Sequence, residues 1–255
     1  MSKLTEILAK IRRKWTKIRL QPIRVFCFHH VSDAYKSSYM WEEDWTNTDV
    51  LKNFMMDMQR DGYTFISLPE AQAKLTNDTF RKGKYAVLTA DDGFKTLLNI
   101  VPWLIEEQIP ITLFINPKYI IENGIGENVQ ARLDKTRCAK GNEIYLRKSD
   151  LDNMKSPLVT IAYHGYEHLD EWKMEERAFV QNVEKCERTL KVLPLEVIPF
   201  YAHTYGHARE EYNRILDNKK LTPVYVSGGE NYADPTRIDR ELISNERIQN
   251  GKVHV

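Results

Sequence analysis

The sequence predicts an α/β fold in which helices surround a parallel β-sheet or β-barrel. Short runs of apolar and β-branched residues alternate along the chain with longer segments in which apolar residues recur at helical spacing. Such alternation is typical of repeated strand–helix–strand units, whose strands pair in parallel. The chain has 255 residues, of which 42% are hydrophobic, so it can bury a large core.

The individual elements follow in order from the local pattern. The run from Ile23 to Phe28 predicts the first strand, and apolar residues spaced three and four apart predict a helix over 48–60. Pro69 favours the first turn of a short helix. We expect the other helices at 94–108, 175–193 and 208–218, and the other strands at 64–66, 85–89, 111–115, 158–162, 197–201 and, as the last strand, 223–226.

One segment, from Glu122 to Lys148, breaks this rhythm because it is polar and only weakly periodic. We interpret it as an insertion at about 122–148 that lies over one rim of a single domain, which spans residues 21–255.

Charge and cysteine content exclude several classes of protein. Lys and Arg (37) nearly balance Asp and Glu (36), whereas a nucleic-acid-binding domain usually carries a basic excess, so we expect no nucleic-acid partner. The three cysteines, Cys27, Cys138 and Cys186, are far apart and form no CxxC pair. This spacing predicts neither a zinc–thiolate site nor a disulfide framework and fits a reducing compartment.

Residues 1–20 predict a basic amphipathic helix. Seven basic residues face a single acid, Glu6, and apolar residues recur at helical spacing: Leu4, Ile7, Leu8, Ile11, Trp15 and Ile18. This helix either contacts an anionic membrane face peripherally or packs on the domain. The chain has no apolar run of the ~20 residues that span a membrane and no apolar core of a secretion signal. We therefore expect a cytoplasmic protein, with the inner membrane face as a site of contact.

Polar clusters follow three predicted strands, where the chemistry of such folds is concentrated. The first is Asp91-Asp92-Gly93, in which adjacent buried carboxylates ~4 Å apart would repel by about 4 kcal/mol. A bound cation removes this repulsion and leaves one aspartate as an ionised base. The alternative is a surface turn that caps the next helix.

The second cluster contains His164 and His168, which follow the strand expected at 158–162. Two histidines four residues apart point to one side when the intervening loop is helical, and they suit two ligands of a divalent metal. Imidazoles with one carboxylate favour zinc, with cobalt, nickel or iron as alternatives. Two loop histidines without a ligand are the other interpretation. The third cluster, 201–207, is rich in aromatic residues and histidines, which would either shape a sugar pocket or simply pack.

Together these clusters resemble the polysaccharide deacetylase family, also called carbohydrate esterase family four or the NodB-homology domain. The segment 89–93 (TADDG) is similar to the motif T-F-D-D-G, and 164–168 (HGYEH) to H-[ST]-x-x-H with glycine in second place. Residues 201–206 resemble F-A-Y-P-Y-G, and 28–31 (FHHV) resemble the Y-H-x-V that often follows the first strand. Residues 51–68 resemble the helix and G-Y-x-x-I-S-L stretch of the family, so that the likeness covers most of the chain from Val25 to Arg240.

The resemblance implies a distorted (β/α) barrel of about seven parallel strands and one divalent metal, usually zinc. It assigns the metal ligands to Asp92, His164 and His168, and the general base to Asp91. It also assigns an oxyanion-binding backbone N–H to Tyr205. The implied reaction removes N-acetyl groups from an amino sugar in a polysaccharide, a lipid-linked glycan or a surface-polysaccharide precursor.

Several departures from the family pattern leave alternatives open. Ala90 stands where the family has Phe, Thr204 where it has Pro, and His203 where it has Tyr. No copy of the L-x-x-H segment that supplies the general acid is evident. The acid is therefore unassigned among His203, His207 and His254, and Arg237 or Arg240 is a candidate for orienting Asp91. The competing functions are hydrolysis of another bond, such as an O-acetyl ester or a cyclic amide, and sugar binding with weak catalysis. The sequence indicates no oligomeric state.

Overall fold

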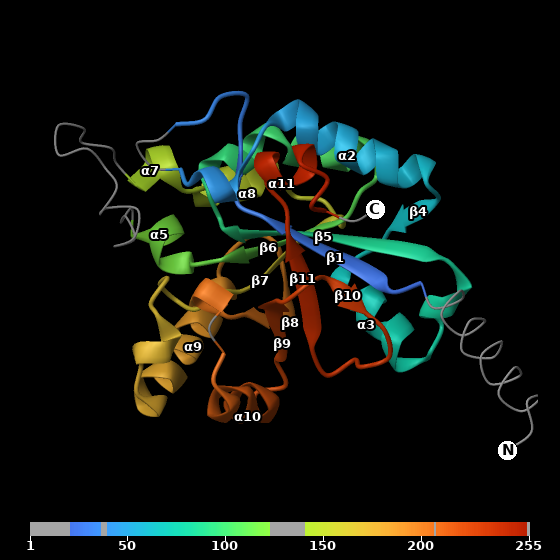
Figure 1. The fold of residues 1–255 in the computed structure, drawn as a ribbon. Helices are drawn as coiled ribbons and strands as arrows, with labels where there is room; N and C mark the ends of the chain where they lie inside the picture. Colours follow the sequence, from blue (N-terminus) through green and yellow to red (C-terminus); the bar gives the residue numbers. More distant parts are fainter. Residues whose placement is uncertain (1–20, 37–39, 123–140, 207, 254–255) are drawn as a thin grey trace, which may run out of the picture.

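The described residues, 21–36, 40–122, 141–206 and 208–253, form a closed barrel of seven parallel strands in the computed structural model (Figure 1). Each strand pairs with the next, and β1 closes the barrel by pairing with β5. The predicted distorted barrel is therefore confirmed. Its strands, in order around the barrel, are β1 (Ile23–Phe28), β5 (Lys84–Asp92), β6 (Ile111–Ile115), β7 (Val159–Tyr163), β8 (Glu196–Ala202), β9 (Thr222–Val226) and β11 (Ile238–Leu242).

Two short strands extend this barrel, and two others form a sheet of their own. β4 (Tyr63–Phe65) pairs in parallel with the start of β5, and β10 (Glu230–Asn231) pairs antiparallel with the start of β1. β2 (His30–Val31) and β3 (Trp45–Thr46) form a separate two-stranded sheet.

Helices cover the outside of the barrel, with α2 and α11 on one side and α9 and α10 on the other (Figure 1). The longer ones are α2 (Thr48–Arg60), α3 (Leu68–Thr76), α9 (Glu176–Leu190) and α10 (Glu210–Asn218). The shorter α-helices are α4 (Val101–Glu106), α5 (Pro117–Ile121), α7 (Gly141–Ile144), α8 (Lys148–Asn153) and α11 (Asn245–Gln249). Single 3-10 turns form η1 (Glu42–Asp44), η2 (Phe80–Lys82), η3 (Lys95–Asn99), η4 (Glu171–Lys173) and η5 (Thr204–Gly206). None of the described helices is long and apolar enough to cross a bilayer.

Two expectations about secondary structure are wrong. The single helix expected at 94–108 is divided into η3 and α4, because Ile100 leaves helical geometry (φ −124°) and Pro102 has no N–H for a continuous helix. The strand expected to be last, at 223–226, is followed by β11. Three consecutive charged residues, 239–241, lie in β11, so this segment lacks the apolar run that predicts a strand.

Alternation along each strand separates two apolar layers. Val87 of β5 lies inside the barrel with Phe114 and Phe200, whereas Leu88 packs outward against the helices. By the same alternation Thr89 and Asp91 face the interior, and Ala90 belongs to the outer layer. The replacement of the family's Phe by Ala90 thus lies in the outer core and not in the cavity.

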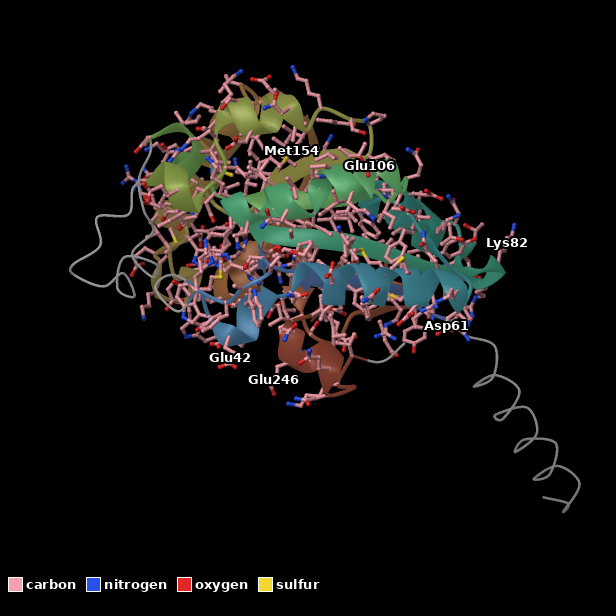
Figure 2. All side chains as sticks on the ribbon, turned by 90° about the horizontal axis from the view of Figure 1, so that it is seen from above. Glu42, Asp61, Lys82, Glu106, Met154 and Glu246 are labelled. Atoms are coloured by element: carbon pink, nitrogen blue, oxygen red, sulfur yellow. The ribbon has the colours of Figure 1, made fainter. Side chains whose placement is uncertain are left out.

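Because all seven strands run in parallel, their carboxyl ends meet at one rim. In Figure 2, Asp61 and Lys82, which precede β4 and β5, mark the amino end of the barrel. Glu42 of η1 and Glu246 of α11 lie away from them, where these two elements contact each other. The predicted helix at 1–20, most of the predicted insertion (123–140), Cys138, His207 and His254 lie outside the described residues.

Candidate metal and acid–base site

A cavity of about 570 Å3 opens at the carboxyl rim of the barrel. The residues that line it follow or end six of the seven barrel strands, so the closed barrel gathers side chains that are distant in sequence. Every predicted site residue within the described chain lines this cavity: Asp91, Asp92, His164, His168, His203 and Tyr205.

Three of these residues converge as the sequence predicts for metal ligands. Asp92 ends β5 with a left-handed backbone (φ 67°), and its Oδ1 lies 3.2 Å from Nε2 of His164 and 3.4 Å from Nε2 of His168. One donor atom from each residue lies within 4.8 Å of the others, and each side chain is at most 9% exposed. Two imidazoles and one carboxylate form a donor set that suits zinc.

The hydrogen bond of His164 and the unpartnered oxygen of Asp92 are compatible with a bound cation. Nδ1 of His164 lies 2.8 Å from the carbonyl oxygen of Ala202, which only accepts, so this nitrogen carries the proton. Nε2 of His164 then presents a lone pair to Asp92, whose buried Oδ1 has no hydrogen-bond partner. Burial lowers the pKa of His168, which favours the neutral imidazole that binds metals. The residues present therefore fit a divalent cation.

A glycine turn, rather than the predicted helical loop, brings the two histidines together. Gly165 adopts a left-handed backbone (φ 73°), and a Cβ there would lie 2.9 Å from Nδ2 of Asn182. Oδ1 of Asn182 accepts a hydrogen bond of 2.9 Å from the backbone N–H of Tyr166 and so fixes the turn. The two histidines thus converge without a helical loop between them, and the left-handed backbone of the turn favours glycine in second place.

The predicted base, Asp91, is held by a buried arginine from β11. Its two carboxylate oxygens accept hydrogen bonds from Nη1 (2.6 Å) and Nη2 (2.8 Å) of Arg240, whose guanidinium lies over the Phe114 ring. Burial alone would raise the pKa of Asp91, but Arg240 outweighs it and holds this pKa at about 2. Of the two arginines considered from the sequence, Arg237 instead pairs with Asp239 at the surface.

The sequence interpretation missed His29 as a site residue. This side chain follows β1, lines the cavity, and places Nδ1 3.7 Å from Oδ1 of Asp44 in η1. One of its ring nitrogens lies within 4.8 Å of a carboxylate oxygen of Asp91 and of the Cys27 thiol. The available signal was its place directly after a strand, as for the other site residues.

Cys27, His29 and Asp91 thus form a second group of potential ligands. Burial raises the pKa of the Cys27 thiol well above its ordinary value, which disfavours the thiolate that binds metals. Arg240 already occupies both oxygens of Asp91 with a positive charge. Of the two groups, the one formed by Asp92 and the two histidines is therefore the better candidate for a cation site.

The remaining predicted residues line the cavity in different ways. The His203 side chain is fully buried, with Nδ1 2.7 Å from Oε2 of Glu171 and Nε2 3.2 Å from Oδ1 of Asn213. Tyr205 is 49% exposed and packs edge-on against the ring of His168, with centroids 4.4 Å apart. Both ring nitrogens of His203 are thus engaged by the protein, whereas Tyr205 faces the cavity.

A sequence model described as polysaccharide deacetylase matches residues 79–224, more than half of the chain. Among solved structures, the chain is similar to IcaB from Ammonifex degensii (17% identity, TM-score 0.68) and to the Streptococcus pyogenes deacetylase PplD in complex with acetate (17%, 0.72). Each alignment covers 91% of this chain and 97% of the other. A de-N-acetylase from Aggregatibacter actinomycetemcomitans is similar at 16% identity and a TM-score of 0.64, over 88% of this chain and 95% of that one. These identities establish a common fold. No curated protein sequence matches the chain.

Proposed function

Because the chain belongs to the polysaccharide deacetylase family, whose members are hydrolases of N-acetyl amide bonds, we propose that it removes N-acetyl groups from an amino sugar with the help of a divalent metal ion. The observation that carries this proposal is the convergence of Asp92, His164 and His168 beside the ionised Asp91 in one cavity. The substrate would be a polysaccharide, a lipid-linked glycan or a surface-polysaccharide precursor. We propose zinc as the metal because of the donor set.

The metal, when bound by Asp92, His164 and His168, supplies polarisation of the acetyl carbonyl and acidification of water. Asp91 accepts the proton of the attacking water, and its bidentate contact with Arg240 keeps it ionised and fixes the direction of its oxygens. The backbone N–H of Tyr205 helps to hold the developing oxyanion. These groups come from the ends of β5, β7 and β8, which the rigid barrel holds in a common orientation.

His29 is the general acid that this geometry favours. It lines the same cavity as Asp91. Because Asp44 lies beside Nδ1 of His29, the other ring nitrogen, Nε2, is the one available to protonate the leaving amine. His203 is a weaker candidate because Glu171 and Asn213 engage both of its ring nitrogens. The buried His30 is weaker still, because burial lowers its pKa to about 3.

The test combines metal analysis with product analysis. Purified full-length protein should contain close to one zinc per chain and should release acetate and a free amine from N-acetylated amino-sugar oligomers. Release of acetate from O-acetylated sugars but not from the N-acetylated oligomers would indicate an O-acetyl esterase, and a ring-opened acid formed from a cyclic amide would indicate a cyclic amidase. Zinc-loaded protein that forms no amine from any N-acetyl sugar would refute the proposal.

We further propose that the enzyme acts at the inner face of the membrane. The basic and apolar composition of residues 1–20 supports contact with anionic lipid, which would bring a lipid-linked glycan to the cavity. This part of the proposal is independent of the catalytic assignments.

A further inference from the structure

We propose that Glu171, His203 and Thr204 form a buried clamp that positions Tyr205 against the metal ligand His168. Glu171 and Thr204 lie on separate segments, η4 after the second metal-binding histidine and η5 after β8. The clamp rests on the proposed function, because it concerns the placement of the oxyanion donor relative to the metal site. Its three members are positioning residues, since none of them is assigned a contact with substrate.

Glu171 is the centre of the clamp. It is fully buried, and Oε1 accepts a hydrogen bond of 2.7 Å from the Tyr201 hydroxyl, while Oε2 lies 2.7 Å from Nδ1 of His203. Oε1 also accepts the backbone N–H of Thr204 at 3.4 Å. A buried carboxylate is retained only when it is well compensated, and here the compensating groups all lie in the segment from the end of β8 to the start of η5.

A second tie joins the same two segments. The hydroxyl of Thr204 donates a hydrogen bond of 2.5 Å to the carbonyl oxygen of Leu169, the residue that follows His168. Proline, which the family pattern has at this position, could not make this contact because it has no hydroxyl. The departure at Thr204 therefore adds a direct link between the loop of the metal ligand and the loop of Tyr205.

The backbone of Tyr205 explains why such a link is needed. Tyr205 adopts a left-handed conformation (φ 56°, ψ 11°), which is unfavourable for a residue other than glycine. Its neighbours are held on both sides: Thr204 by Glu171 and Leu169, and Gly206 through its N–H to the His203 carbonyl (3.2 Å). These contacts fix the unusual conformation, and with it the direction of the Tyr205 backbone N–H.

His203 connects the clamp to α10 and β9. Its Nε2 lies 3.2 Å from Oδ1 of Asn213 in α10, which also accepts the Tyr225 hydroxyl of β9 at 2.8 Å. The ring is therefore fixed from both ends. This accounts for a buried histidine at the rim that the acid–base chemistry does not require.

The experiment compares Thr204→Val with Thr204→Ser in the full zinc-loaded chain. Valine keeps the shape of threonine but cannot donate to Leu169, whereas serine keeps the donor. We expect Thr204→Val to lower kcat for acetate release by about 10-fold or more, since ~1 Å of misplacement can cost 10²-fold in rate. KM and zinc content should not change, and Thr204→Ser should retain most of the wild-type kcat.

Equal kcat in these two variants would overturn the clamp, as would a loss of zinc that parallels the loss of activity. Wild-type protein without deacetylase activity would overturn the proposed function and, with it, the clamp. Active wild-type protein with equal kcat in the two variants would overturn the clamp alone. If Thr204→Val does not fold, Glu171→Gln gives the decisive readout. Its control is Glu187→Gln on α9, whose carboxylate pairs with Lys191 at the surface. A folded, zinc-loaded Glu171→Gln variant with the kcat of the control would overturn the proposal.

Discussion

Removal of the Arg240 guanidinium should destabilise the barrel and change the ionisation of Asp91, the proposed base. Arg240 is fully buried, and both of its contacts with Asp91 are charged hydrogen bonds. Loss of one partner of a buried ion pair typically costs about 3–5 kcal/mol because the other charge is left uncompensated. We therefore expect Arg240→Met to lower the free energy of unfolding of the metal-free protein by this amount at pH 7.

The pH dependence of this loss has a defined sign. In the wild type, Arg240, together with His164 and His29, outweighs the effect of burial and lowers the pKa of Asp91 from 3.8 to about 2. This shift corresponds to roughly 2.5 kcal/mol of stability that is fully present above about pH 4 and is lost as the pH falls through 2. Without the guanidinium, only His164 and His29 oppose the effect of burial, so we expect the pKa of Asp91 to rise. The variant should therefore become more stable on acidification from pH 7 to 5, because Asp91 takes up a proton in the native state.

Urea unfolding between pH 5 and 7 measures these changes in the free energy of unfolding. Two further variants test whether the changes come from the ion pair. The double variant Asp91→Asn/Arg240→Met removes both charges, so it should regain much of the lost stability yet remain inactive. Arg237→Met is the matched control, because this exposed pair with Asp239 should contribute less than about 1 kcal/mol. If Arg240→Met is as stable as the control at pH 7 and shows no gain on acidification, the proposed role of the ion pair is refuted.

The remaining predictions concern the acid, the metal and the N-terminal segment. His29→Gln should lower kcat by about 10²-fold or more with zinc content unchanged, and full activity in this variant would exclude His29 as the acid. Zinc at 100 times its Kd should add about 2.7 kcal/mol to the free energy of unfolding, an effect measured by titrating chelated protein. Asp92→Asn should abolish most of this gain; an equal gain would contradict the ligand assignment. Deletion of residues 2–20 should reduce binding to anionic liposomes without changing kcat on soluble substrate, and unchanged binding would rule out the membrane contact.

Local pattern was sufficient to predict helices around a parallel sheet or barrel, whereas the choice of a barrel and the assignment of candidate metal ligands came from the family resemblance. The strands that lead to Asp91 and His164 are runs of apolar and β-branched residues, so their positions follow from the sequence. The carboxyl ends of parallel strands meet at one rim, which is why residues after different strands could be expected to converge. The ends of the strands follow less directly from the sequence. The strand expected at 85–89 continues through Asp91 and Asp92, because both residues pair with β6.

The parts that could not be predicted depend on contacts between distant strands. The place of His29 directly after a strand is only a weak signal, and its position beside Asp91 follows from the pairing of β1 with β5. β11 was missed because Arg240 and Glu241 are unfavourable in a buried strand unless each has a partner. The partners, Asp91 and Arg24, lie on β5 and β1 and cannot be inferred from the local sequence.

The ion pair that orients Asp91, the proposed base, also joins β11 to β5. In the register of the sheet, Cys27 of β1 lies opposite Thr89 of β5 on one side and Leu242 of β11 on the other. Arg240 therefore reaches across the inside of β1 to bind Asp91, and it also donates to the Thr89 hydroxyl at 3.2 Å. The contact that compensates the buried charge on β11 is therefore the same contact that orients Asp91, and it requires β11 and β5 to lie on opposite sides of β1, as they do in the closed barrel.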